Sequence, residues 1–171
     1  MSLTFDKLLL AIHVGGVLIA FGVLLVYPLL VWIVHSVMAP LGLPLLHRAQ
    51  LRIIQRLVNP GLTVVAVSGV VLALDLGTLG TFYSKWGIAA AIVLGAITGG
   101  YLAPREARLA QIAERDVRDG GGGGGPGEHH ASTASIVLSR DYQALSSQVS
   151  NVTRLASLIV LATIVVMIAH K

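Results

Sequence analysis

A single histidine lies inside the first long apolar run of the chain, where a polar side chain is costly. His13 stands in the stretch LLLAIHVGGVLIAFGVLLVYPLL, which covers residues 8–30. It follows Lys7 by six residues, which places it about 9 Å along a helix that rises about 1.5 Å per residue. A polar group at this depth is a functional candidate by default. His13 is therefore the first residue to consider for chemistry.

Imidazole binds both haem iron and copper, so a ligand for haem b or copper is the sharper interpretation of His13. Such a site needs a second ligand at a similar depth. Met167 and His170 are the candidates near the end of the last apolar run, and Met167 lies nearer the level of His13. The alternative is a neutral imidazole that hydrogen-bonds to a serine, a threonine or a backbone carbonyl of another helix. The sequence leaves both open, so no cofactor is certain.

The residues expected of an enzyme or an ion-coupled transporter are missing from the sequence pattern. The chain has no cysteine, which excludes thiolate metal sites, disulfides and cysteine nucleophiles. No Asp or Glu stands in the middle of an apolar run, whereas ion-coupled transport usually needs buried ionisable groups. No paired-carboxylate arrangement or metal motif of specific spacing is visible. The pattern favours a protein that is not an enzyme, and it predicts no catalytic residue.

The composition indicates that lipid is the solvent of this protein. Of the 171 residues, 55% are hydrophobic and 12% are charged, against about a quarter charged in soluble domains. Four apolar runs are candidates to cross a bilayer. They predict spans at about 8–34, 58–75, 86–103 and 150–169. The expected fold is all-α: a four-helix transmembrane bundle that forms a single integral membrane domain over residues 1–171.

The arginines predict the orientation of the chain. All nine lie between the first and second runs or between the third and fourth, and the three lysines lie on the other side. Because basic short loops stay in the cytoplasm, both termini should be outside a multi-pass protein of the plasma membrane. The net charge of +4 is then explained by lipid headgroups and not by nucleic acid. Arg48, Arg52 and Arg56 are expected on one face of an amphipathic helix that lies on the inner membrane surface between Pro44 and Pro60.

Short helical extensions are expected on the cytoplasmic side. The charged segment after Pro104 should continue the third span, and the last helix should begin before it enters the membrane. A flexible linker at 120–127, with six consecutive glycines, would allow these two extensions to pair as an antiparallel stalk. His35 and His47 are expected among headgroups at the inner interface.

Small residues recur at the spacing that lets membrane helices approach closely. The first, second and third spans each carry such positions, and we expect them to pack helix against helix. These predicted packing residues are Gly16, Ala20, Ser68, Gly69, Gly95 and Gly99.

The stretches LLLAIHVGGVLIAFG and VSGVVLALDLGTLGTFYSKWG, with the arginine-rich segment between them, resemble an uncharacterised bacterial integral-membrane family known as domain of unknown function 2269. More distantly, the opening helix is similar to those of copper-resistance D-type and haem-binding protoporphyrinogen-oxidase-like membrane proteins. The first resemblance implies a four-helix protein of the bacterial inner membrane with no assigned function. The second implies that a histidine at position 13 can bind haem or copper, although this chain lacks the further polar ligands that those proteins carry in later spans.

Three functions follow from these features. The leading one is a non-catalytic accessory or assembly subunit that contacts the lipid bilayer and packs against other membrane subunits or a second copy of itself. The alternative is a haem- or copper-binding protein for redox chemistry or metal handling that uses His13. The third is an oligomeric channel or transporter.

Overall fold

The computed structural model describes residues 3–37, 40–121 and 138–169, and every secondary-structure element in these ranges is helical. In chain order the elements are α1 (Leu3–Val37), the 3₁₀ turn η1 (Pro40–Gly42), α2 (Leu43–Ile53), the π-helical turn η2 (Ile54–Val58), α3 (Asn59–Asp75), α4 (Phe82–Gly95), the π-helical segment η3 (Ala96–Leu102), α5 (Ala103–Gly121) and α6 (Arg140–Ala169). Most of the predicted glycine linker, together with His129, His130 and His170, lies outside the described residues.

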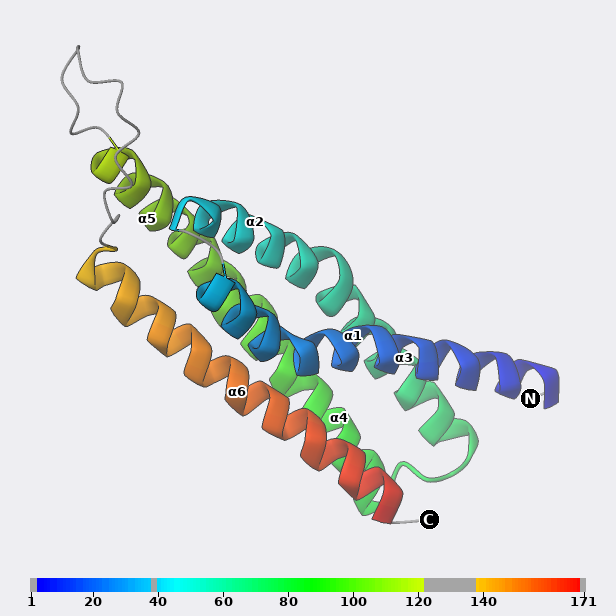
Figure 1. Ribbon diagram of the computed structural model, residues 1–171. Coiled ribbons are helices and arrows are strands. Elements are labelled where there is room, and N and C mark those ends of the chain that lie inside the picture. The colour runs from blue at the N-terminus through cyan, green and yellow to red at the C-terminus, as the bar shows by residue number, and fades with distance from the viewer. Residues whose placement is uncertain (1–2, 38–39, 122–137, 170–171) are drawn as a thin grey trace, which may run out of the picture.

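Four continuous helices are long and apolar enough to cross a bilayer: Phe5–Leu29, Leu43–Asp75, Phe82–Asp119 and Arg140–Ala169. The second joins α2, η2 and α3, and the third joins α4, η3 and α5. These helices pack together as a bundle (Figure 1). The predicted fold class is confirmed: the chain is an all-α, multi-pass membrane protein.

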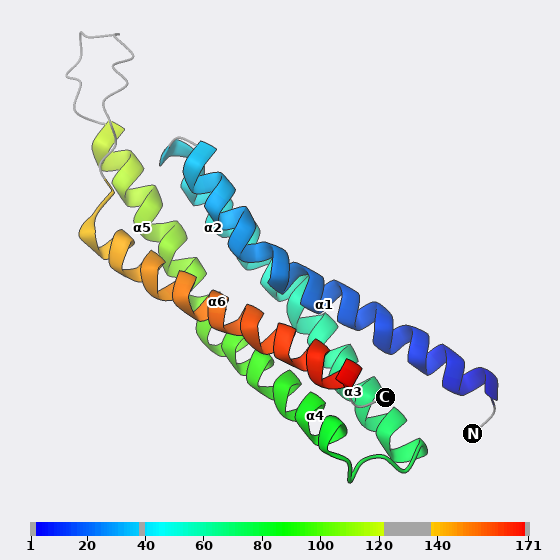
Figure 2. The same ribbon diagram turned by 60° about the horizontal axis from the view of Figure 1, so that its bottom comes forward.

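The four long helices form a ring of neighbours. α1 packs against α3 and α6, and α4 packs against the same two helices from the other side. The N-terminal half of α1 diverges from α6, as Figures 1 and 2 show, and His13 within it contacts Ser68 of α3. At one end, here called the basic end, α2 packs against α5 and α5 packs against the start of α6. The other end, which holds the turn between α3 and α4, is here called the turn end.

The middle of the bundle is packed mainly with apolar side chains, and the outer surface is also apolar. One cluster occupies the middle of the bundle: Ala20, Phe21, Leu24, Val58, Leu62, Leu94, Ala156 and Val160. Large aliphatic side chains cover the outside, including Leu18 at 69% exposure and Ile92 at 66%. Such a surface is stable against lipid tails, which are as apolar as leucine.

Pro28 lies inside α1 and leaves one backbone acceptor without its usual donor. A proline has no N–H, so the carbonyl of Leu24 loses its intrahelical hydrogen bond. The hydroxyl of Ser157 on α6 donates to that carbonyl at 2.9 Å. The helix therefore continues through the proline, and a hydrogen bond between helices replaces the missing one.

The region before Pro60 differs from the separate surface helix expected from the sequence. α2 and α3 form one continuous helix, and η2 connects them directly before the proline. In η2 the N–H of Asn59 bonds to the carbonyl of Ile54, five residues back, which is the π-helical pattern. Pro60, which has no N–H to donate, follows directly after this widened turn as the second residue of α3.

The turn between α3 and α4 begins at a glycine that is required by its backbone conformation. Gly77 has φ of +66°, which side-chain-bearing residues rarely adopt. The N–H of Gly77 bonds to the carbonyl of Leu74 at 3.2 Å, and that of Thr78 to Ala73 at 2.9 Å. This is a Schellman motif, and it ends α3 directly after the last apolar turn.

Candidate functional site

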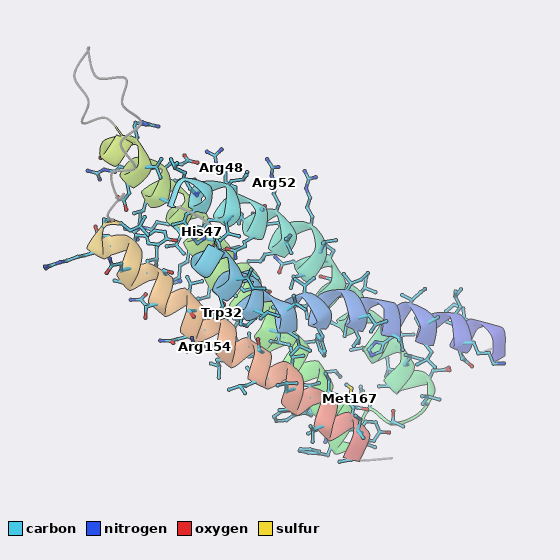
Figure 3. The ribbon with its side chains drawn as sticks, viewed as in Figure 1. Trp32, His47, Arg48, Arg52, Arg154 and Met167 are labelled. Carbon is cyan, nitrogen blue, oxygen red and sulfur yellow. The ribbon has the colours of Figure 1, made fainter. Side chains whose placement is uncertain are left out.

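A cleft of about 240 Å³ lies at the turn end between α1, α3, α4 and α6. Most of its lining is aliphatic, with His13 and Met167 among the few heteroatom-bearing side chains. Figure 3 marks Met167 near the C-terminal end of α6. The structure therefore brings the histidine of the first span and the methionine of the last to one cleft. A largely apolar pocket with a few convergent polar groups is the default binding site in a protein without known ligands.

A hydrogen bond to Ser68 orients the ring of His13. Nδ1 of His13 lies 3.0 Å from the Ser68 hydroxyl oxygen. That hydroxyl also lies within hydrogen-bond distance of the backbone carbonyl of Val64. When it donates its proton to this carbonyl, it accepts from His13, and Nδ1 carries a hydrogen. In the neutral imidazole, Nε2 is then the nitrogen with a free lone pair. Metal-binding histidines are commonly held in this way, by a hydrogen bond to the other ring nitrogen.

Small residues on α1 and α3 make room for this histidine. A Cβ on Gly69 would lie 3.0 Å from Cε1 of His13, so a larger residue would require the ring to shift. A Cβ on Gly16 would lie 3.0 Å from a methyl group of Val65, and one on Gly61 would lie 3.1 Å from Cβ of Ala20. The predicted packing residues of the first two spans therefore lie along the α1–α3 contact.

Of the two predicted partners of His13, Met167 lies within the described residues. The Met167 side chain is 41% exposed, and its terminal methyl group lies 3.1 Å from where a Cβ of Gly87 would stand. His170 lies outside the described residues. Within the described ranges, no three His, Asp or Glu side chains lie close enough together to hold a metal ion.

A buried polar network at the basic end was not expected from the sequence. Tyr27 on α1 donates to one oxygen of the Glu106 carboxylate on α5. Nδ1 of His47 on α2 lies 2.7 Å from the other oxygen, and Nε2 of His47 lies 2.8 Å from the hydroxyl of Tyr142 on α6. All four side chains are buried, with exposures of 1–4%. The network joins four helical segments through one carboxylate and one imidazole.

His47 therefore faces the protein interior and not the headgroups, and Figure 3 marks it beneath α2. The buried face of the α2 region carries Leu43, His47, Gln50 and Ile54. Steps of three and four residues mark one face of a helix, so the sequence does place His47 and Gln50 on the same stripe as Leu43 and Ile54. Glu106 gives a weaker signal, because it stands in a segment with other charged residues, such as Arg105 and Arg108.

The predicted basic face lies opposite this stripe. Arg48, Arg52 and Arg56 are exposed on the α2 and η2 surface, and Figure 3 shows Arg48 and Arg52 pointing away from the bundle. Arg48 forms an ion pair with Glu114 of α5. Exposed pairs of this kind contribute little to stability, roughly 0–1 kcal/mol.

Gly95 and Gly99 lie at a shallow groove between α3 and α4, and the α3–α4 contact does not use them closely. A Cβ on Gly95 would meet no heavy atom of the described residues within 4 Å, and one on Gly99 would meet the side chain of Asn59 at 3.5 Å. The groove has a volume of about 310 Å³, and Asn59 and Thr63 are its polar lining residues. Asn59 also accepts a hydrogen bond from Thr98 at 2.9 Å.

Comparison of the chain with family models, with curated proteins and with solved structures gives no match. Functional conclusions therefore rest on the geometry of the individual sites.

Proposed function

We propose that the protein is a non-catalytic membrane subunit that binds a transmembrane helix of another subunit along the groove between α3 and α4. The observation that carries this proposal is the open space at Gly95. Membrane helices associate where small residues let two backbones approach closely. A small-residue face that the bundle itself leaves open is suited to a helix from outside it.

The polar residues of the groove support a helix as the occupant. Asn59 and Thr63 lie beside the two glycines. A side-chain amide within an apolar groove can hydrogen-bond to a partner, and such bonds between membrane helices contribute about 0.6 kcal/mol on average. Both π-helical segments, η2 and η3, adjoin this position, and π-bulges occur frequently at functional sites.

Substitution of Gly95 tests the proposal directly. Gly95→Leu fills the groove without a clash at Cβ, so the subunit should fold but lose its partner. The protein would be purified by affinity from native membranes in mild detergent, with two differently tagged copies to detect self-association. Gly22→Leu on α1 is the matched control, because a Cβ there also meets no described heavy atom within 4 Å.

We expect the wild-type protein and Gly22→Leu to be recovered in a complex, and Gly95→Leu as a lone chain with an unchanged unfolding temperature. Recovery of the wild-type protein only as a monomer would refute the subunit function. Retention of the partner by Gly95→Leu would refute the groove as its binding surface.

A second candidate function is copper handling in the cleft at the turn end. The supporting observation is that His13 and Met167 line the same cleft, with Nε2 of the neutral His13 ring left free to bind. Thioether and imidazole together favour Cu(I) among the common metals. Pockets for drug-sized ligands measure roughly 300–1,000 Å³. A cleft of about 240 Å³ is below that range, so it suits an ion better than a haem.

Titration with Cu(I) against a chromogenic chelator tests this second function. We expect one equivalent of Cu(I) to bind, and His13→Ala and Met167→Leu each to remove it. Ser84→Ala also changes a residue of the cleft lining but removes no soft ligand, so it should bind normally. A visible absorption spectrum of the same sample tests for haem. A Soret band that is lost in His13→Ala would identify haem, and not copper, as the cofactor bound by His13.

A further inference from the structure

A second cavity lies beside the buried network at the basic end and contains an unsatisfied amide. Gln50 is 4% exposed, and among the described residues neither its side-chain oxygen nor its nitrogen has a hydrogen-bond partner. Gln50 lines a cavity of about 20 Å³ together with Glu106 and Tyr27. A buried polar group without a partner calls for a bound water or ion. A volume of this size is enough for one water-sized particle.

The charges around the cavity do not balance when His47 is neutral. Glu106 is 1% exposed and lies next to a single basic group, His47. Arg48, the neighbouring residue on α2, pairs with the partly exposed Glu114 instead. A carboxylate buried without a compensating positive charge is strongly unfavourable. A protonated His47 would balance Glu106, and a cation bound in the cavity would balance it when the imidazole is neutral.

We propose that this cavity is a binding site for one small monovalent cation, Na⁺, which neutralises Glu106 in place of the proton that the Glu106–His47 pair otherwise holds. This site lies at the opposite end of the bundle from the copper cleft and does not depend on the groove between α3 and α4.

The remaining lining of the cavity has the chemistry that a hard cation requires. Ser146, Ser150 and Thr153 on α6 contribute hydroxyl groups, and Gln50 contributes its amide oxygen. Hard cations are bound by carboxylate, carbonyl and hydroxyl oxygens. The site combines one negative charge with neutral oxygens, which matches a monovalent ion better than a divalent one.

Four titratable groups from four helical segments surround the site, and the cation must be considered together with them. They are Tyr27 on α1, His47 on α2, Glu106 on α5 and Tyr142 on α6. Asp116 lies further along α5, where it accepts the backbone N–H of Ser139 at 2.9 Å. When Na⁺ enters a site that holds a proton, the proton must leave to the bulk solution. Na⁺ and protons therefore compete for a single place.

The experiment measures thermal unfolding of the full-length protein in mild detergent while NaCl replaces choline chloride at constant ionic strength. Choline is too large for a cavity that holds one water-sized particle. In parallel, a pH-indicator dye in weakly buffered solution measures protons released when Na⁺ is added. The variants are Glu106→Gln, which removes the charge and keeps the shape, and Gln50→Leu, which removes the unpartnered amide. Glu114→Gln, on the same helix but paired with Arg48, is the matched control.

If Na⁺ is the ligand, the unfolding temperature of the wild-type protein and of Glu114→Gln rises saturably with Na⁺, and about one proton is released per chain. Glu106→Gln loses both responses, and Gln50→Leu needs at least tenfold more Na⁺ for the same rise. No rise of the unfolding temperature with Na⁺, together with no proton release, would overturn the proposal and leave a water-filled structural cavity.

Discussion

The hydroxyl oxygen of Ser157 on α6 lies 2.9 Å from the carbonyl oxygen of Leu24 on α1, the acceptor that Pro28 deprives of its intrahelical donor. The two residues are 133 positions apart in the chain. The same hydroxyl lies 3.1 Å from the carbonyl of Thr153 in its own helix. A helix irregularity and its compensation therefore belong to different helices.

This relationship predicts a coupling between Ser157 and Pro28. Ser157→Ala leaves the Leu24 carbonyl unpaired and should lower the free energy of unfolding by about 1 kcal/mol. In a Pro28→Ala background the residue at 28 regains its N–H, so the same substitution should cost less. A double-mutant cycle by reversible unfolding in detergent measures the difference. An equal cost of Ser157→Ala in both backgrounds would show that the hydroxyl does not serve this carbonyl.

The close packing at Gly61 predicts that a methyl group added at this position destabilises the bundle. A Cβ at this position would lie 3.1 Å from Cβ of Ala20 and 3.4 Å from its backbone nitrogen, so α1 and α3 would have to move apart by a few tenths of an ångström. Overpacking of this kind costs roughly 1–3 kcal/mol. Gly61→Ala should therefore lower the unfolding temperature. Gly22→Ala, which meets no described atom, should raise it through better helix propensity. A similar rise for both variants would contradict the close approach of α1 and α3.

The hydrogen bond between Tyr142 and His47 predicts how much the buried network stabilises the basic end. Tyr142→Phe removes the hydroxyl that lies 2.8 Å from Nε2 of His47, and a buried ring nitrogen without a partner costs about 1–3 kcal/mol. The free energy of unfolding should fall by that amount. Tyr83→Phe at the turn end is the matched control, with an expected change within about 0.5 kcal/mol. Hydrogen exchange should show the loss in α2 and the first turns of α6, and an unchanged rate there would contradict it.

The hydrogen bond between Ser68 and His13 predicts that Ser68 orients the imidazole for copper binding. This prediction rests on the proposed copper function. Ser68→Ala removes the acceptor of the Nδ1 hydrogen bond but leaves both proposed copper ligands in place. Loss of such supporting bonds typically weakens metal binding by 10–100-fold. Competition titration with Cu(I) should show this loss, while Ser84→Ala should leave the affinity within twofold of the wild-type value. Unchanged affinity in Ser68→Ala would mean that this bond does not orient the ligand.

The distribution of arginines predicts the orientation in the membrane. The chain has no cysteine, so a single introduced cysteine is an unambiguous label. Gly80→Cys, in the turn between α3 and α4, should react with a membrane-impermeant maleimide in intact cells. Asp119→Cys, at the end of α5, should react only after permeabilisation. The reverse pattern would invert the proposed topology.

At the basic end, the pattern of residues in the sequence does not predict the buried contacts. The sequence predicts His47 among headgroups because it flanks the inner membrane interface. Its burial depends on α5 and α6 covering that face of α2, which brings Glu106 and Tyr142 to it from 59 and 95 positions away. No periodicity within one helix can indicate which distant helix lies against it.

The hydrophobic pattern by itself determined the four apolar helices, because a chain with so few charges must satisfy its backbone hydrogen bonds internally within lipid. It also determined that Gly16 and Ala20 lie on one face of the first helix, because residues four apart share a face. The tertiary structure decided which faces meet. It placed His13 against Ser68, brought Met167 to the same cleft, left Gly95 open, and enclosed Glu106 with His47. These outcomes depend on how four helices of similar apolarity pack, and the side-chain contacts that select one packing lie between segments far apart in the sequence.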